Sequence, residues 1–242
     1  MVNLEYYKSS LKESDMDFTF RNLIGELRKK SDKIDEAVEI KIKALWDWGI
    51  ERISDKDIRQ AIKRYYFAGV PVEFFSAPAS VSGGKHPSWH NEPGGIVWHL
   101  TECCVSVDRL LQTYGYRDED GRYDFRARDI VLAATLITDT LKNGSPWGER
   151  TLKNHGELAA LRWKHLAHES VDDDALEQIA EAAHYHYGRY TVVPEGEKKI
   201  RFRDLPPLVQ IVHLLDSVSA SDKNMIIYKP VEHIPSPESM RP

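Results

Sequence analysis

Apolar residues recur every three to four positions through most of the chain, a period that predicts helices rather than strands. Three amphipathic helices are predicted in the N-terminal part, over 17–31, over 33–50, and from Ser54 to a stop at Gly69 and Pro71. The same spacing predicts later helices, which cover 95–114, 127–141, 155–166, 172–187 and about 205–218. Sustained strand alternation is lacking, so the predicted fold class is all-α.

Two of the predicted helices are apolar on nearly every face, yet each carries an acid. Asp139 lies near the end of the run 127–141, and Asp216 lies within the run 205–218. A helix apolar all round is a core helix, and a buried carboxylate is costly unless it is paired or bound to a cation. Lys and Arg are scarce in both runs. The pattern leaves two interpretations open, a pair of ion-paired structural acids or a metal site.

The chain divides into three parts by composition. Residues 1–75 read as an N-terminal helical extension, 76–225 as the core domain, and 226–242 as a Pro-rich tail. The core domain opens with 76–95, where Pro, Gly and small residues predict a long loop. Long loops in compact domains are often functional, and this one carries His86 and His90 just before the next predicted helix.

Composition narrows the classes of function. The 242 residues are 41% hydrophobic and 29% charged, as in an ordinary soluble globular protein, and a net charge of −5 gives no general attraction to nucleic acid or anionic membranes. No apolar run reaches the ~20 residues that span a bilayer, and no signal-peptide pattern is evident. Cys103 and Cys104 are adjacent, which suits neither a disulfide nor a CxxC metal site. We therefore expect a cytoplasmic protein.

Histidines favour the metal interpretation. His99 lies at the edge of the apolar stripe of 95–114, where a lone histidine is more often a hydrogen-bonded core residue. His155 follows Asn154 at a predicted helix start, and the positive end of a helix keeps an imidazole neutral and available to a metal. His184 and His186 close the helix over 172–187.

In chain order these residues form a familiar series. The segments are Gly94-Gly95-Ile96-Val97-Trp98-His99-Leu100-Thr101, Thr138-Asp139-Thr140-Leu141-Lys142, His155-Gly156, His186-Tyr187-Gly188 and Leu214-Leu215-Asp216-Ser217. Their order resembles the HD-domain phosphohydrolase superfamily, an all-helical fold named for a His-Asp pair. Lys85-His86-Pro87 also resembles a histidine-bearing loop found in a subset of members. The resemblance covers roughly 76–224.

The resemblance implies both a site and a chemistry. The expected metal ligands are His99, Asp139, His155, His186 and Asp216, holding one or two divalent ions of Mn, Fe, Mg, Ni or Zn. Asp139 and Lys142 are the expected catalytic residues, and His86, Lys142 and Arg189 the expected substrate contacts. His186, rather than His184, should face the cluster, because helix residues two apart point in different directions. The expected partner is a small phosphorylated substrate, a nucleotide above all; a homo-oligomer stays open.

One position departs from the family. Thr138 stands where the signature histidine is expected, and a hydroxyl is a poor ligand for a borderline transition metal. Metal affinity could fall, preference could shift to Mn²⁺ or Mg²⁺, or catalysis could be lost, unless His86 or His155 compensates. The leading hypothesis is a metal-dependent phosphohydrolase acting on a nucleotide or related phosphoester. The alternatives are a degenerate HD module that binds nucleotide or metal without turnover, and a purely structural helical bundle.

Overall fold

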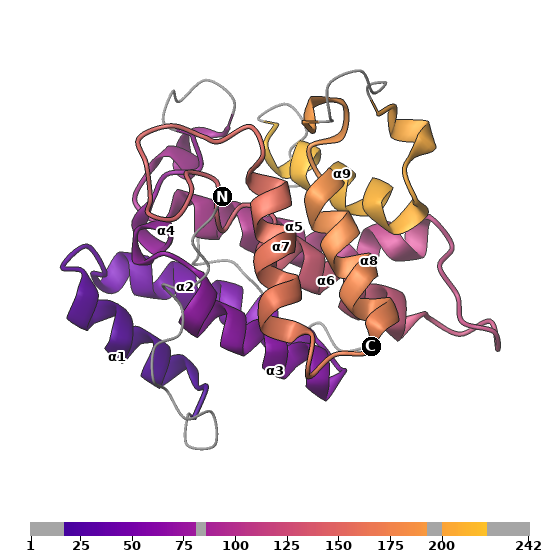
Figure 1. Ribbon diagram of the computed structural model, residues 1–242, viewed down its shortest axis with the longest axis horizontal. Helices are drawn as coiled ribbons and strands as arrows, with labels where there is room; N and C mark the ends of the chain where they lie inside the picture. The colour runs from indigo at the N-terminus through magenta and orange to yellow at the C-terminus, as the bar shows by residue number, and fades with distance from the viewer. Residues whose placement is uncertain (1–16, 81–85, 193–199, 222–242) are drawn as a thin grey trace.

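The computed structural model describes residues 17–80, 86–192 and 200–221, and these form nine α-helices without a β-strand (Figure 1). An isolated antiparallel bridge joins Arg117 and Tyr123 in the link between two helices. The all-α fold class is therefore confirmed for the described residues. None of the helices among them is both long enough and apolar enough to cross a membrane. The Pro-rich tail predicted for 226–242 lies outside the described residues.

Four helices make up the N-terminal part: α1 (Phe20–Lys30), α2 (Glu36–Trp48), α3 (Lys56–Arg64) and α4 (Val72–Ser76). The first three begin where a side chain satisfies free backbone N–H groups of the first turn. Asp35 Oδ1 accepts from Val38 N at 2.9 Å, and Asp55 does the same for α3. The short helix α4 lies within a stretch that the sequence pattern left without a helix.

Five longer helices follow: α5 (Gly95–Thr113), α6 (Phe125–Ile137), α7 (His155–Ala167), α8 (Asp173–Tyr185) and α9 (Pro207–Ser219). Helix α6 is central and packs against α5, α8 and α9 (Figure 1). Helices α7 and α8 are joined by a short turn and pack along one another. The ends of these helices, rather than their middles, carry most of the residues of the predicted site.

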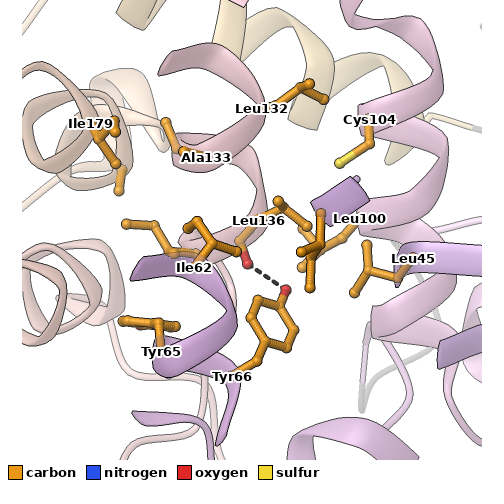
Figure 2. Close-up of a cluster of buried hydrophobic side chains, with 14 of the residues drawn as sticks. Leu45, Ile62, Tyr65, Tyr66, Leu100, Cys104, Leu132, Ala133, Leu136 and Ile179 are labelled. Carbon is orange, nitrogen blue, oxygen red and sulfur yellow. Dashed lines mark hydrogen bonds between the residues drawn. The ribbon is translucent and has the colours of Figure 1, made fainter. Parts of the chain in front are cut away.

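One apolar core connects the N-terminal helices to the rest, running from Leu23 in α1 to Leu215 in α9. Figure 2 shows its centre, where Leu45 of α2 faces α5 and side chains of α6 lie between them. Tyr66 is buried there, and its hydroxyl donates to the Leu136 carbonyl at 2.7 Å. The N-terminal helices thus pack onto the helices that carry the site.

Helix α6 is buried on nearly every side, as its apolar sequence predicts. The predicted extent of 127–141 is wrong at its end, because the helix stops at Ile137 and Asp139 lies in the turn that follows. The hydroxyls of Thr138 and Thr140 donate to the carbonyls of Thr135 and Ile137, at 2.9 and 2.8 Å. Hydroxyl bonds of this kind compete with the helical backbone pattern. The acid therefore leaves the helix where the backbone can turn it toward other elements.

Candidate metal centre

The start of α5 places His99. Gly95 opens the helix, and a Cβ there would stand 1.9 Å from the carbonyl oxygen of His90, so only glycine allows this approach. Gly94 before it has φ +72°, a conformation that glycine adopts without strain. The glycine pair therefore lets the preceding loop pack on the first turn of α5. His99 lies one turn further on, fully buried.

A second close approach brings His155 and His186 together. His155 is the first residue of α7, and His186 follows the last residue of α8. A Cβ on Gly156 would come within 2.7 Å of the carbonyl oxygens of Ala183 and His184. Because Gly156 lacks a side chain, the start of α7 can lie against the end of α8. Both histidines are 1% exposed.

Three acceptor atoms converge at this point. His155 Nε2 lies 3.2 Å from Asp139 Oδ1 and 3.2 Å from His186 Nε2, and His186 Nε2 lies 3.8 Å from the same carboxylate oxygen. The carboxylate is 2% exposed. These distances make one compact group of two imidazoles and one acid in the interior of the protein.

The backbone fixes which nitrogens carry protons. His155 Nδ1 lies 2.6 Å from the carbonyl oxygen of Leu152, and His186 Nδ1 lies 2.7 Å from that of Ala183. A carbonyl oxygen only accepts, so each Nδ1 is the donor, and in a neutral imidazole the Nε2 is then an unprotonated acceptor. Burial lowers the pKa of His186 to about 4, which keeps this ring neutral at pH 7. Lone pairs of two rings and a carboxylate thus face one another.

A second group shares the acid. His99 Nε2 lies 3.1 Å from Asp216 Oδ1 and 3.9 Å from Asp139 Oδ2, the oxygen not used by the first group. His99 Nδ1 lies 3.0 Å from Ser219 Oγ, whose hydroxyl also lies 3.1 Å from Glu102 Oε2. Asp216 is 21% exposed at its side chain and is the outermost ligand candidate. Each of the two groups could hold a metal ion, with Asp139 common to both.

Lys142 supplies the positive charge that the acidic cluster needs without a metal. Its Nζ lies 2.9 Å from Asp139 Oδ2, and its side chain is 15% exposed. Burial alone would raise the pKa of Asp139, but Lys142 and the neighbouring histidines outweigh it and hold that pKa well below its usual value. Burial likewise opposes the charge on Lys142, whose pKa is nevertheless raised by Asp139 and Asp216. Both groups are therefore charged near neutral pH.

Asp216 is also ionised. Burial would raise its pKa, but His99 lowers it to about 2. The two carboxylates are thus acceptors throughout the neutral range, fit to hold a cation rather than to deliver a proton. Their charge lies beside neutral imidazoles and one lysine.

The structure brings together the five side chains expected as ligands, from α5, α7, α9, the end of α8 and the turn after α6. His186 lies in the cluster and His184 is half-buried beside it, as the helix spacing predicts. His86 lies next to His99, with ring centroids 5.0 Å apart. Arg189 belongs to a short 3₁₀-helix (Gly188–Tyr190), and its side chain lies outside the described part of the structure.

Three neighbours of the cluster had no role in the sequence interpretation. His90 is fully buried and lies 5.4 Å from His99 between ring centroids. Glu102, one turn along α5 from His99, approaches His90 Nε2 to 3.1 Å, and Tyr187 packs on the His155 ring with centroids 5.3 Å apart. The signal for His90 was its place in the loop four residues after His86. No motif pointed to Glu102 or Tyr187.

Comparisons of the chain with protein-family models, with curated proteins and with solved structures gave no significant match.

Proposed function

We propose that the protein is a metal-dependent phosphohydrolase whose site is centred on Asp139. One observation carries the proposal: the Nε2 atoms of His155 and His186 and the Oδ1 atom of Asp139 all face one point as acceptors. Buried acceptors without a shared proton repel one another, and a cation between them removes that cost. The arrangement therefore favours a bound divalent ion over a purely structural role for the histidines.

The dimensions suit such an ion. Two ligands about 2.1 Å from a metal at the tetrahedral angle are about 3.4 Å apart. The three separations in the first group are 3.2, 3.2 and 3.8 Å. The Nδ1–carbonyl bonds of both histidines are also the outer hydrogen bonds that ligating imidazoles usually make. His155, His186 and Asp139 would hold one ion, and His99, Asp139 and Asp216 a second.

A bound divalent ion supplies Lewis acidity toward a phosphoryl oxygen and acidifies water. The chain's own residues would do the rest. Asp139 places one carboxylate oxygen in each group and so keeps the two groups at a fixed separation. Asp216 and Lys142 are the more exposed members of the cluster, which puts substrate access on their side.

Lys142 is the candidate substrate contact that the geometry favours most. Its ammonium is charged, partly exposed and anchored to Asp139 Oδ2. A phosphoryl group brought to this side of the cluster would meet a cation that can neutralise its oxygens. The substrate class that this arrangement suits is a phosphoester, and a nucleotide remains the expectation from the family resemblance. Arg189 and His86 keep their expected substrate roles as untested predictions.

The resemblance to the HD superfamily is part of the proposal, and Thr138 is its weak point. The Thr138 hydroxyl donates to the Thr135 carbonyl, so its proton is committed within the chain. The second group therefore has one fewer nitrogen than the family pattern implies. This observation favours the second candidate function, a module that binds metal or nucleotide without turnover.

The test combines metal binding with hydrolysis for wild type and Asp139→Asn. Protein freed of metal by a chelator is melted with and without Mn²⁺, Fe²⁺, Mg²⁺ or Zn²⁺, and a panel of phosphoesters and nucleotides is assayed with each ion. An ion present at 100 times its Kd stabilises by about 2.7 kcal/mol, equal to a rise of roughly 5–10 °C in Tm for a chain of this size. Wild type should show this rise and phosphate release, and Asp139→Asn should lose both.

Asp129→Asn is the matched control. Asp129 is another buried acid of α6, bonded to the backbone N–H of Asp55 at 2.7 Å, and it lies outside both metal groups. Its replacement should lower Tm while keeping the metal-dependent rise. Metal binding without hydrolysis of any phosphoester would favour the non-hydrolytic module, and equal Tm with and without every ion would overturn the metal centre.

A further inference from the structure

A second cluster of histidines lies beside the Asp139 site. The rings of His86, His90 and His99 are mutual neighbours, with centroids 5.0, 5.4 and 5.7 Å apart. One nitrogen of each lies within 4.8 Å of those of the other two. His90 and His99 are fully buried, and His86 is partly exposed. Neither Asp139 nor Asp216 belongs to this group.

The backbone around His90 is firmly held. His90 lies in a 3₁₀-helix (Ser88–Asn91), its N–H donates to the Pro87 carbonyl at 2.9 Å, and its carbonyl accepts from Ala79 N at 2.8 Å. That carbonyl also rests where a Gly95 side chain would otherwise stand. Because the loop is fixed on the first turn of α5, the ring of His90 is aimed at His99 by the fold rather than by its own rotation.

The nitrogens of this cluster are poorly satisfied within the described residues. Both ring nitrogens of His90 and Nδ1 of His86 are buried without a hydrogen bond there. A buried polar atom without a partner costs about 1–3 kcal/mol, and native proteins rarely leave several together. Burial lowers the pKa of His86 to about 3 and also lowers that of His90, so both rings are neutral and present lone pairs.

One carboxylate attends the cluster. Glu102 Oε2 lies 3.1 Å from His90 Nε2. Trp89 Nε1 donates to the other oxygen of Glu102 at 3.1 Å, and Ser219 Oγ lies 3.1 Å from Oε2, so the carboxylate is held in place. A carboxylate beside one nitrogen of a ligating histidine is the common outer partner of such a ligand, and it leaves the other nitrogen for the metal.

We propose that His86, His90 and His99 form a third, nitrogen-rich site for a divalent ion of the zinc class, with Glu102 as the outer partner of His90. Three imidazoles suit Zn²⁺, Ni²⁺ or Co²⁺ and disfavour Mg²⁺ and Ca²⁺, which take oxygen ligands. The site shares His99 with the Asp139 cluster but needs neither carboxylate of that cluster. It therefore goes beyond the proposed hydrolysis and makes His86 a metal ligand instead of a phosphate contact.

The test counts metal ions in a background where the Asp139 site is disabled. Asp139→Asn protein freed of metal is loaded with Zn²⁺, passed through gel filtration and analysed for bound zinc. We expect about one equivalent to remain, and we expect it to be lost when His90→Gln or His86→Gln is added to Asp139→Asn. His168→Gln, which removes an exposed histidine, should keep it.

Folding of each variant is checked by circular dichroism, because His90 is buried. Should the glutamine variants fail to fold, Cu²⁺ bound to Asp139→Asn replaces them as the probe: nitrogen couplings from three imidazoles in its electron paramagnetic resonance spectrum would support the site, and couplings from fewer would overturn it. Zinc absent from Asp139→Asn, or retained in folded double variants, would also overturn it. Hydrolysis by wild type is a separate readout, so a failed proposal for the Asp139 site leaves this result interpretable.

Discussion

Lys142 Nζ lies 2.9 Å from Asp139 Oδ2, the same carboxylate oxygen that faces His99 Nε2 at 3.9 Å. The lysine therefore occupies the position of a counter-cation for the atom that a metal ion in the second group would bind. Lys142 and that ion compete for Asp139. The lysine keeps the buried acid paired while the ion is absent, and ion binding would free its ammonium for a phosphoryl oxygen.

Lys142→Met should therefore move two properties in opposite directions. Removing the competing charge should tighten metal binding by at least about ten-fold, because two cations a few ångströms apart repel strongly in a partly buried site. Removing a charge that faces the phosphoryl group should lower kcat by roughly 100-fold or more. Kd from metal titration and kcat from phosphate release are the two measurements.

Two variants frame that result. Lys142→Arg keeps the charge and should retain more hydrolysis than Lys142→Met. Lys164→Met removes an exposed lysine that pairs with Glu177 and should change neither property. Looser metal binding in Lys142→Met would show that the lysine supports the ion instead of competing with it.

The sequence predicted the main features of the fold because each depends on local periodicity. Helix α6 shows this best, since an apolar sequence on every face has no stable position except the centre of a helical bundle. The glycines were visible too, but not their purpose. That Gly156 admits the end of α8, and Gly95 the carbonyl of His90, are contacts between segments distant in the chain or around a loop. Periodicity carries no information about them.

The candidate site was predicted less completely. The order of His99, Asp139, His155, His186 and Asp216 pointed to a common site, and the coordinates bring these side chains together. The end of the helix before Asp139 was missed, because hydroxyl bonds from Thr138 and Thr140 compete with the helical pattern in a way that hydrophobic spacing does not register. Glu102 was missed because its neighbours, His90 and Ser219, come from other elements.

Acid should destabilise the metal-free protein from about pH 6.5 downward, before its carboxylates titrate. Burial lowers the pKa of His186 to about 4 in the folded state, whereas an unfolded histidine titrates near 6.5. The unfolded state therefore binds more protons between these values. The stability contributed by neutral His186 is complete above about pH 6.5 and is lost as pH falls toward 4, by up to about 1.4 kcal/mol per pH unit.

Urea midpoints measured at several pH values between 7.5 and 4.5 would check this slope. His86 and His90 act in the same direction, because their pKa values are also lowered by burial. His186→Gln should reduce the slope, and replacement of exposed His168 by Gln should leave it unchanged. A stability that stays flat from pH 7 to pH 5 in metal-free protein would contradict the buried, neutral state of these rings.

Replacing Thr138 tests the point where the chain departs from the HD pattern. Its side chain is 2% exposed, and its hydroxyl donates to the Thr135 carbonyl at 2.9 Å. Thr138→Val removes that bond and should cost about 1 kcal/mol of stability with little effect on metal affinity. Thr138→His places a nitrogen beside Asp139 and should tighten Zn²⁺ by at least about ten-fold, or ~1.4 kcal/mol, while Mg²⁺, which prefers oxygen ligands, changes little.

Competition with a coloured chelator gives the Zn²⁺ affinity independently of protein stability. This separation matters because a larger side chain at a buried position costs roughly 1–3 kcal/mol by overpacking, so a lower Tm alone says nothing about the site. Selective tightening of Zn²⁺ over Mg²⁺ would show that residue 138 faces the ion and that the wild-type site lacks one nitrogen ligand. Equal changes for both ions, or none, would mean that residue 138 is a helix-end residue and that the ligands come from the other elements alone.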